Sequence, residues 1–167
     1  MSDFIKFRNQ YPEFVFNSYE LTENSETINI RYNFEIKGLS SFSPEWKIKK
    51  CSPENITDDI KLQKLVFSLG MVELVSYWKI TCSPRVSVLC GTLDEKQIRW
   101  WKTQYFNGLG EFFYRNGINT DFDSFMQIST ADNIVYEGSD TSRSLEGCLI
   151  PVGGGKDSIV TLELLKE

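Results

Sequence analysis

The residues with the clearest chemical potential form one run near the carboxyl end of the chain: Gly153, Gly154, Gly155, Lys156, Asp157 and Ser158. Glycine has no Cβ and adopts positive φ angles easily, so successive backbone N–H groups in such a turn can converge on one anion. The residues that follow, 159–165, predict an amphipathic helix whose N-terminus favours negative charge. The run therefore predicts a site for phosphate, and most simply for the phosphates of a nucleotide.

Each polar residue of the run has a role that such a site requires. Lys156 would neutralise phosphate charge, and Ser158 would donate its hydroxyl to a phosphate or cap the helix. Asp157 would accept N–H groups of the loop or bind Mg²⁺ together with the phosphates. A turn that opens a helix without any ligand is the alternative interpretation of the same residues.

The composition of the chain excludes several other classes of site. The 167 residues include no histidine, which removes a His-ligated metal site and a His general base from this segment. A net charge of -5 disfavours binding to nucleic acid, because phosphate neutralisation needs a basic face. The four cysteines lack metal-site spacing and no signal peptide precedes them, so we expect free thiols in the cytoplasm. No apolar run is long enough to span a bilayer, so we expect no membrane contact.

The amino-terminal half reads as strands that follow a short helix over residues 2–10. Apolar residues alternate through 26–37, which indicates a strand with one buried face, and residues 13–23 before it are also strand-like. These two segments predict an antiparallel hairpin. A polar loop over 40–44 and a third strand over 46–49 follow.

The next segments predict helices. Apolar residues recur at helical spacing from Ile56 to Leu69, with Thr57 or Asp58 as the cap. Gly70 is expected to interrupt this helix before a second one over 71–80.

After a strand or extended linker over 85–89, another helix opens at Leu93 or Asp94. It breaks or kinks at 107–110, resumes over 111–115 and stops at Asn116-Gly117; a strand over 125–129 follows. This order predicts an α+β module of antiparallel strands plus helices over residues 1–146.

Residues 136–146 are polar and rich in serine and glycine, so they are the expected linker. Residues 147–167 then predict the first strand, glycine loop and helix of a truncated nucleotide-binding α/β domain, with the strand over 148–152.

Three further sets of residues have a structural and a functional interpretation. The aromatic residues are expected to pack in a core rather than to stack on a ligand: Trp100, Trp101, Tyr105, Phe112, Phe113 and Tyr114. Lys47, Lys49 and Lys50 fit a solvent-facing strand edge better than a diphosphate site. The cysteines are expected to be buried apolar residues, with a catalytic role for Cys148 as the weaker alternative.

The glycine loop resembles S-G-G-x-D-S, the pyrophosphate-binding loop of the PP-loop ATP pyrophosphatases, with Gly153 in place of the serine. The longer run from Leu149 through Leu165 is similar to the UDP-N-acetyl-α-D-muramoyl-L-alanyl-L-glutamate epimerase family. The upstream stretch from Phe106 to Ile118, FNGLGEFFYRNGI, resembles the same family. Together these two stretches cover about thirty residues, and the family's members are considerably longer.

This resemblance implies the N-terminal part of an enzyme that uses ATP and Mg²⁺ to invert the terminal L-Glu of a UDP-sugar dipeptide in peptidoglycan precursor synthesis. The carboxylate would be adenylated, so that the neighbouring Cα–H becomes acidic enough for a base to remove. The resemblance places ATP on the loop 153–158 and leaves the catalytic residues and the oligomeric state open.

Two alternatives remain. One is another PP-loop ATP pyrophosphatase, either an amide-forming ligase or an RNA-thiolating enzyme. The other is a non-catalytic module that binds a substrate or a partner, and the chain alone is expected to show little ATP turnover.

Overall fold

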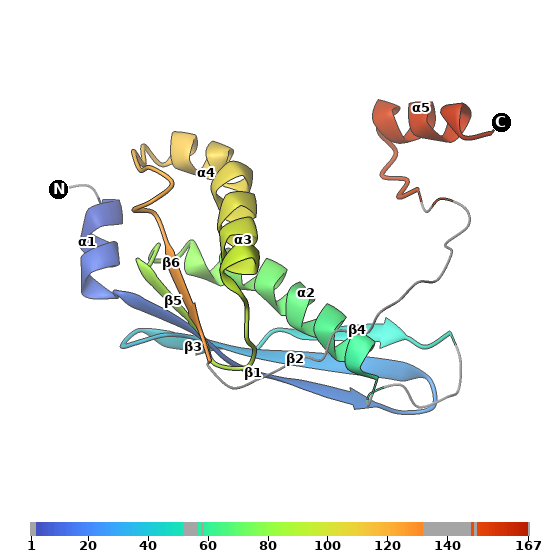
Figure 1. The fold of residues 1–167 in the computed structure, drawn as a ribbon, viewed down its shortest axis with the longest axis horizontal. Coiled ribbons are helices and arrows are strands. Elements are labelled where there is room, and N and C mark those ends of the chain that lie inside the picture. Colours follow the sequence, from blue (N-terminus) through green and yellow to red (C-terminus); the bar gives the residue numbers. More distant parts are fainter. Residues whose placement is uncertain (1–2, 52–56, 58, 132–147, 149, 167) are drawn as a thin grey trace. The chain divides into compact units, whose positions relative to one another are not determined.

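The computed structural model describes residues 3–51, 57, 59–131, 148 and 150–166. The chain divides into two compact units, Met1–Tyr136 and Glu137–Glu167 (Figure 1). The first unit contains, in chain order, α1 (Asp3–Gln10), β1 (Glu13–Glu23), β2 (Thr27–Ile36), β3 (Ser40–Phe42), β4 (Glu45–Lys49), α2 (Ile60–Trp78), β5 (Arg85–Val88), α3 (Glu95–Gly108), α4 (Gly110–Arg115) and β6 (Gln127–Thr130). The second unit contains α5 (Lys156–Leu164).

One six-stranded sheet organises the first unit, in the order β3-β2-β1-β5-β6, with β4 also paired to β2. The predicted hairpin is confirmed, because β1 and β2 pair antiparallel with Phe16 opposite Phe34. A bulge between Phe16 and Ser18 shifts the register, so that Tyr19 lies opposite Tyr32.

The prediction of antiparallel strands is confirmed for β1, β2 and β4 but not for β5, which pairs parallel with both β1 and β6. A parallel pair needs a long crossover connection, and α2 supplies it between the β1–β2 hairpin and β5. The first unit is therefore α+β with a mixed sheet. β3 is a second difference, since it forms within the segment predicted to be a loop.

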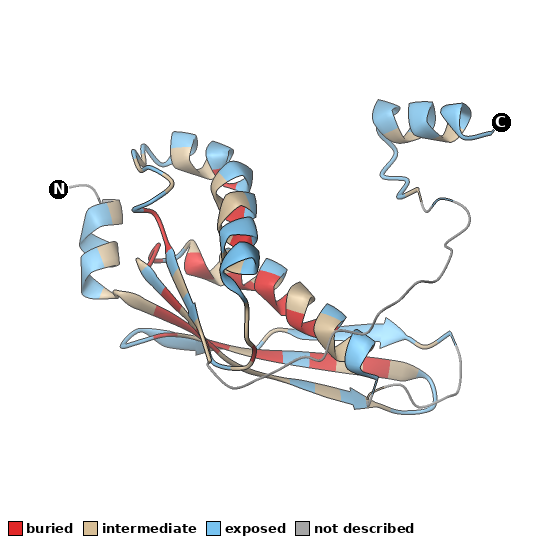
Figure 2. Cartoon of the chain, in the orientation of Figure 1, coloured by how far each residue is buried: buried red, intermediate tan, exposed pale blue. Residues whose placement is uncertain are grey.

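The core lies between α2 and the sheet, as the buried residues in Figure 2 show. The alternating residues of β2 that the sequence predicted to be buried all face it: Ile28, Ile30, Tyr32, Phe34 and Ile36. Two buried hydroxyl groups tie the layers together. Tyr32 donates to the Val66 carbonyl of α2 at 2.8 Å, and Tyr105 of α3 donates to the Met71 carbonyl at 2.6 Å.

The helix α2 runs unbroken through Gly70, so the predicted interruption there is wrong. A Cβ on Gly70 would lie 2.6 Å from Phe16 Cζ and 2.8 Å from Tyr32 Cε1. Glycine is therefore present because the helix passes close to the sheet, and not because the helix ends. The cap also differs from the prediction: Asp59, not Thr57 or Asp58, is the N-cap and accepts from the N–H of Lys61.

The helix boundaries further along the chain agree with the prediction. Asp94 caps α3 and forms a reciprocal capping box with Gln97. α3 ends at Gly108, α4 follows from Gly110, and Gly117 has a φ of 60° after α4 ends.

In the second unit, α5 forms as expected, but Cys148 and residues 150–152 lie outside any strand. A strand exists only where its N–H and C=O groups pair with a neighbouring strand, and none pairs with these residues. The predicted linker over 136–146 lies outside the described residues. Among the helices that the structure describes, none has both the length and the apolar content to cross a bilayer.

Candidate functional site

The glycine loop leaves its backbone open to a ligand. Gly154 has a φ of 79°, in the left-handed region that favours glycine. A Cβ built on Gly153, Gly154 or Gly155 would meet no other atom within 4 Å, so free space lies beside all three positions. Gly155 is the N-cap of α5 and offers no side chain to the first-turn N–H groups, which therefore remain available to an anion.

The side chains of Lys156 and Asp157 are exposed beside this backbone, whereas Ser158 is half-buried. Lys156 and Asp157 form no ion pair within the described part of the chain. Ser158 donates its hydroxyl to the Gly155 carbonyl at 2.8 Å, so it stabilises the turn instead of pointing a free donor outward. The loop thus brings together the six residues that the sequence singled out, with a cation and a carboxylate that are both free to meet a ligand.

The donor set fits an anion such as phosphate better than a protein-built metal site. Uncapped N–H groups and an exposed lysine are the groups that phosphate oxygens accept from. No group of three or more Cys, Asp or Glu residues converges on a metal position within the part of the chain that is described. Asp157 would therefore contribute a single carboxylate to a Mg²⁺ that is held mainly by phosphate oxygens.

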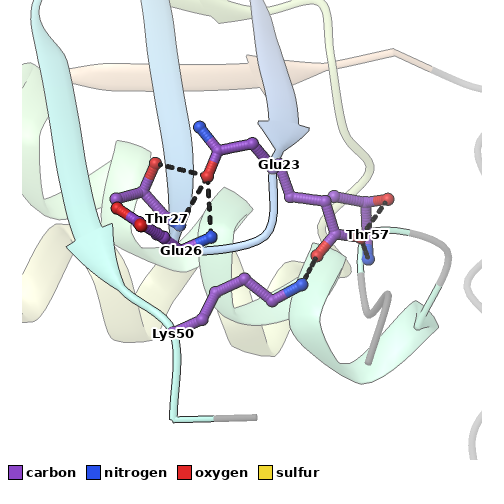
Figure 3. A network of polar contacts seen from close by, with 6 residues as sticks. Glu23, Glu26, Thr27, Lys50 and Thr57 are labelled. Atoms are coloured by element: carbon purple, nitrogen blue, oxygen red, sulfur yellow. Dashed lines mark hydrogen bonds and ion pairs between the residues drawn. The ribbon is translucent and has the colours of Figure 1, made fainter. Parts of the chain in front are cut away.

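A second polar cluster lies inside the first unit (Figure 3). The Lys50 ammonium lies 2.6 Å from the Glu23 carboxylate, with 2% and 7% of the two side chains exposed. The other Glu23 oxygen accepts from the backbone N–H and the hydroxyl of Thr57, both at 3.0 Å. The cluster joins the end of β1 to the residue after β4 and to the segment before α2.

Lys50 therefore contradicts the prediction of a solvent-facing lysine, whereas Lys47 and Lys49 are exposed as expected. Its ammonium is buried against Glu23 and is therefore not exposed to a diphosphate. The sequence did carry a signal for this pair. Tyr19, Leu21 and Glu23 are alternate residues of β1, so their side chains lie on the same, core-facing side. A carboxylate buried on that side needs a cation beside it.

The buried thiols are not disposed to act as nucleophiles. Burial raises the pKa of Cys82 to about 11 and that of Cys90 to about 12, so both remain protonated near neutral pH. Cys51 and Cys148 are exposed, so the prediction that the cysteines are buried holds only for Cys82 and, in part, for Cys90. The catalytic role suggested for Cys148 gains no support, because no interaction of its thiol is found within the described residues.

The aromatic residues divide between core and surface. Trp101 and Tyr105 are buried, as expected for a helix that packs on α2. Trp100 and Tyr114 are 54% and 88% exposed, so the core-packing interpretation is wrong for these two. Glu111 and Arg115, four residues apart on α4, form an exposed ion pair at 3.4 Å.

Comparisons with known proteins agree on one family. The family described as MurL N-terminal domain matches residues 6–167. Three curated relatives carry the name UDP-N-acetyl-alpha-D-muramoyl-L-alanyl-L-glutamate epimerase. The relative from Xanthomonas oryzae pv. oryzae is 28% identical over 106 residues, that from Salinispora tropica 32% over 106 residues, and that from Micromonospora sp. 35% over 109 residues.

Each matched stretch covers 64% of this chain but only 22–23% of the relative's own length. The matched part of the chain thus corresponds to less than a quarter of each curated protein. No solved structure matches the chain significantly.

Proposed function

The chain belongs to the MurL N-terminal domain family, and from this premise we propose that it is the N-terminal part of an ATP-dependent epimerase. The substrate would be UDP-N-acetylmuramoyl-L-alanyl-L-glutamate, whose terminal L-Glu becomes D-Glu for peptidoglycan synthesis. The observation that carries the proposal is the family match over residues 6–167, which includes the glycine loop. The printed name shared by the three relatives supplies the reaction class.

The use of ATP follows from the acidity that the reaction needs. A Cα–H beside a carboxylate is a very weak acid, because its carbanion would place a second negative charge next to the first. When a carboxylate oxygen attacks the α-phosphorus of ATP, pyrophosphate leaves and the carboxylate charge is removed. A base then takes the Cα proton, a proton is added on the opposite face, and water cleaves the mixed anhydride to release AMP.

The loop of this chain would hold the phosphates during that sequence. The N–H groups of residues 153–155 and of the first turn of α5 would donate to phosphate oxygens, and Lys156 would balance their charge. Asp157 would hold Mg²⁺ against the same phosphates, and the metal would neutralise charge that develops on the leaving group. Ser158 would keep the turn in shape through its bond to the Gly155 carbonyl.

Neither a histidine nor a buried thiol of this chain can serve as the base that removes the Cα proton. The chain has no histidine, and its buried thiols are protonated at neutral pH. Because the matched stretch covers only 22–23% of each relative's length, we expect the 167-residue chain alone to produce no D-Glu and to turn over little or no ATP.

The test is chiral amino-acid analysis of the product formed by the complete protein with ATP, Mg²⁺ and the UDP-linked dipeptide. We expect D-Glu, together with AMP and pyrophosphate in equal amounts. Asp157→Ala should lower turnover by about a hundredfold or more, because a phosphate and metal contact is lost. Glu163→Ala, on the same helix and paired only at the surface with Lys166, is the matched control and should retain activity.

Two results would overturn the proposal. One is the absence of D-Glu from a folded wild-type protein. The other is full turnover by Asp157→Ala, which would remove the loop from the ATP site.

A further inference from the structure

A continuous groove lies on the first unit, where the turn after α2 meets α1 and α4. One hollow of about 340 Å³ is lined by residues of α1, of the turn 79–82 and of α4. A second hollow of about 500 Å³ continues along α4 and the end of α3. Both are lined by Lys79, Phe112 and Asn116, so they form one groove. Its size is within the range of sites for nucleotide-sized ligands.

One end of this groove is apolar and aromatic. It is lined by Phe4 and Phe7 of α1, by Ile80, and by Phe112 of α4. Phe7 is 41% exposed and Ile80 is 49% exposed, which leaves apolar surface that a flat ring could cover. Asn116 lies beside these side chains and donates its amide nitrogen to the Phe112 carbonyl at 2.8 Å. That bond leaves the amide oxygen of Asn116 free to accept from a ring N–H.

The other end carries positive charge on a chain whose net charge is -5. The Lys79 side chain makes no ion pair within the described part of the chain. Arg115 pairs with Glu111 at 3.4 Å, but both side chains are more than 70% exposed, so this pair is weak and can rearrange. Two cations thus face a single carboxylate at the open end of the groove.

We propose that this groove binds a nucleoside diphosphate, namely the uridine diphosphate end of the substrate. The inference rests on the proposed function, which requires a UDP-linked substrate. The reacting glutamate is at the opposite end of that substrate, and contacts to such a remote part that are equally strong in the ground state and the transition state lower KM without changing kcat. The base would stack between the aromatic side chains and donate to Asn116, while Lys79 and Arg115 would meet the two phosphates.

The groove also suggests a function for the stretch from Phe106 to Ile118, which is not part of the glycine loop. This stretch forms the end of α3, all of α4 and the turn after it. Phe112, Arg115 and Asn116 all come from it. A nucleotide site would give these residues a common purpose, because packing accounts for Phe106 and Phe113 but not for the exposed Arg115 and Asn116.

The experiment is calorimetric titration of the 167-residue chain with UDP, with ADP as the comparison nucleotide. We expect UDP to bind, ADP to bind more weakly, and the double variant Lys79→Ala/Arg115→Ala to raise the UDP dissociation constant about tenfold or more. Phe112→Ala should raise the dissociation constant for UDP by a similar factor. Lys96→Ala, an exposed lysine of α3 outside the groove, is the matched control and should leave binding unchanged.

The inference is overturned if UDP does not bind the folded chain, if ADP binds as tightly as UDP, or if the double variant binds UDP like wild type. A second measurement separates this failure from failure of the proposed function. In the complete protein, the double variant should raise KM for the UDP-linked dipeptide and leave kcat nearly unchanged. If the wild-type protein forms D-Glu and the variant has an unchanged KM, the groove is not the UDP site, but the proposed epimerase function still holds.

Discussion

The carboxylate of Glu23 and the ammonium of Lys50 are buried together, and each neutralises the charge of the other. Such a pair contributes little compared with an apolar pair of the same size, but the loss of one partner leaves a buried charge without compensation. We therefore expect Lys50→Met to lower the free energy of unfolding by about 3–5 kcal/mol. Urea denaturation followed by circular dichroism measures this change.

The exposed pair between Arg31 and Glu45 is the control for this prediction. Its side chains are 52% and 62% exposed, so Arg31→Ala should cost about 1 kcal/mol or less. The double variant Glu23→Leu/Lys50→Met should be more stable than Lys50→Met alone, because no charge is left buried. Equal losses for Lys50→Met and Arg31→Ala would show that the Glu23 site is open to water.

The buried thiols predict a loss of stability in alkali. Burial raises the pKa of Cys82 to about 11 and that of Cys90 to about 12, from an ordinary value of 9.0. Above the ordinary value the unfolded chain binds fewer protons than the folded chain, so the free energy of unfolding falls as pH rises toward the folded-state values. Below it, both states hold the proton and these groups add no pH dependence.

Denaturation measured at about pH 8 and at about pH 9.5 should show that the free energy of unfolding is lower at the higher pH, by on the order of 1 kcal/mol for each thiol. Over this interval the free energy of unfolding of the variant Cys82→Ala/Cys90→Ala should fall less than that of wild type. Cys51→Ala, at an exposed position, should behave like wild type. Tyrosines, whose ordinary pKa is 10.0, begin to ionise at the upper end of this interval, so the comparison with Cys82→Ala/Cys90→Ala separates the contribution of the thiols. A wild-type protein with the same stability at both pH values would contradict the burial of these two thiols.

The residues of the candidate site differ in how well the sequence predicts them. The loop 153–158 is contiguous, and the conformational freedom of glycine alone suggests its role. Lys50 and the groove at Lys79, Phe112 and Asn116 depend on residues that are far apart in the chain. Only the sheet register and the packing of α1 beside the turn 79–82 bring them together, and local patterns hold no information on either.

At the scale of single elements, α2 shows how tertiary packing overrides propensity. Gly70→Ala would gain about 1 kcal/mol from helix propensity alone. The added Cβ would, however, lie 2.6 Å from Phe16 Cζ, and the Phe16 and Tyr32 side chains are fully buried and have little room to move. We expect the variant to be less stable by about 1–3 kcal/mol.

Gly108→Ala is the matched control, since Gly108 ends α3 and a Cβ there would meet no atom within 4 Å. This second variant should be neutral or slightly more stable when both variants are compared with the wild-type protein by thermal unfolding. A Gly70→Ala protein as stable as the Gly108→Ala protein would mean that α2 can move away from the sheet at little cost.

The elements themselves follow from local patterns to an unequal degree. The alternation through β2 is sufficient to predict β2 and its buried face, and Asp94 with Gln97 marks the start of α3. The direction in which β5 pairs with β1 is not a local property, because it depends on which way α2 returns the chain. Residues 150–152 show the opposite case, in which an apolar pattern forms no strand because no neighbouring strand pairs with it.

At the scale of the whole molecule, the first unit contains the complete described core, which runs from Phe14 to Met126. No residue of α5 is buried. We therefore expect a chain that ends at Tyr136 to unfold cooperatively, with a midpoint within about 2 °C of that of the 167-residue chain. Differential scanning calorimetry of the two proteins measures this, and a much lower midpoint for the shorter chain would show that residues beyond Tyr136 stabilise the first unit.

β1 lies between an antiparallel and a parallel neighbour, and these two neighbours are synthesised at different times. β2 leaves the ribosome directly after β1 and can pair with it at once, since only the residues 24–26 separate them. The opposite side of β1 waits for β5, which at usual elongation rates arrives roughly 4–14 s after Phe16. During that interval an unpaired edge that carries Phe14 and Phe16 is open to other polypeptides. Slowing translation between β2 and β5 should therefore increase misassembly during synthesis, although the finished molecule is unaffected.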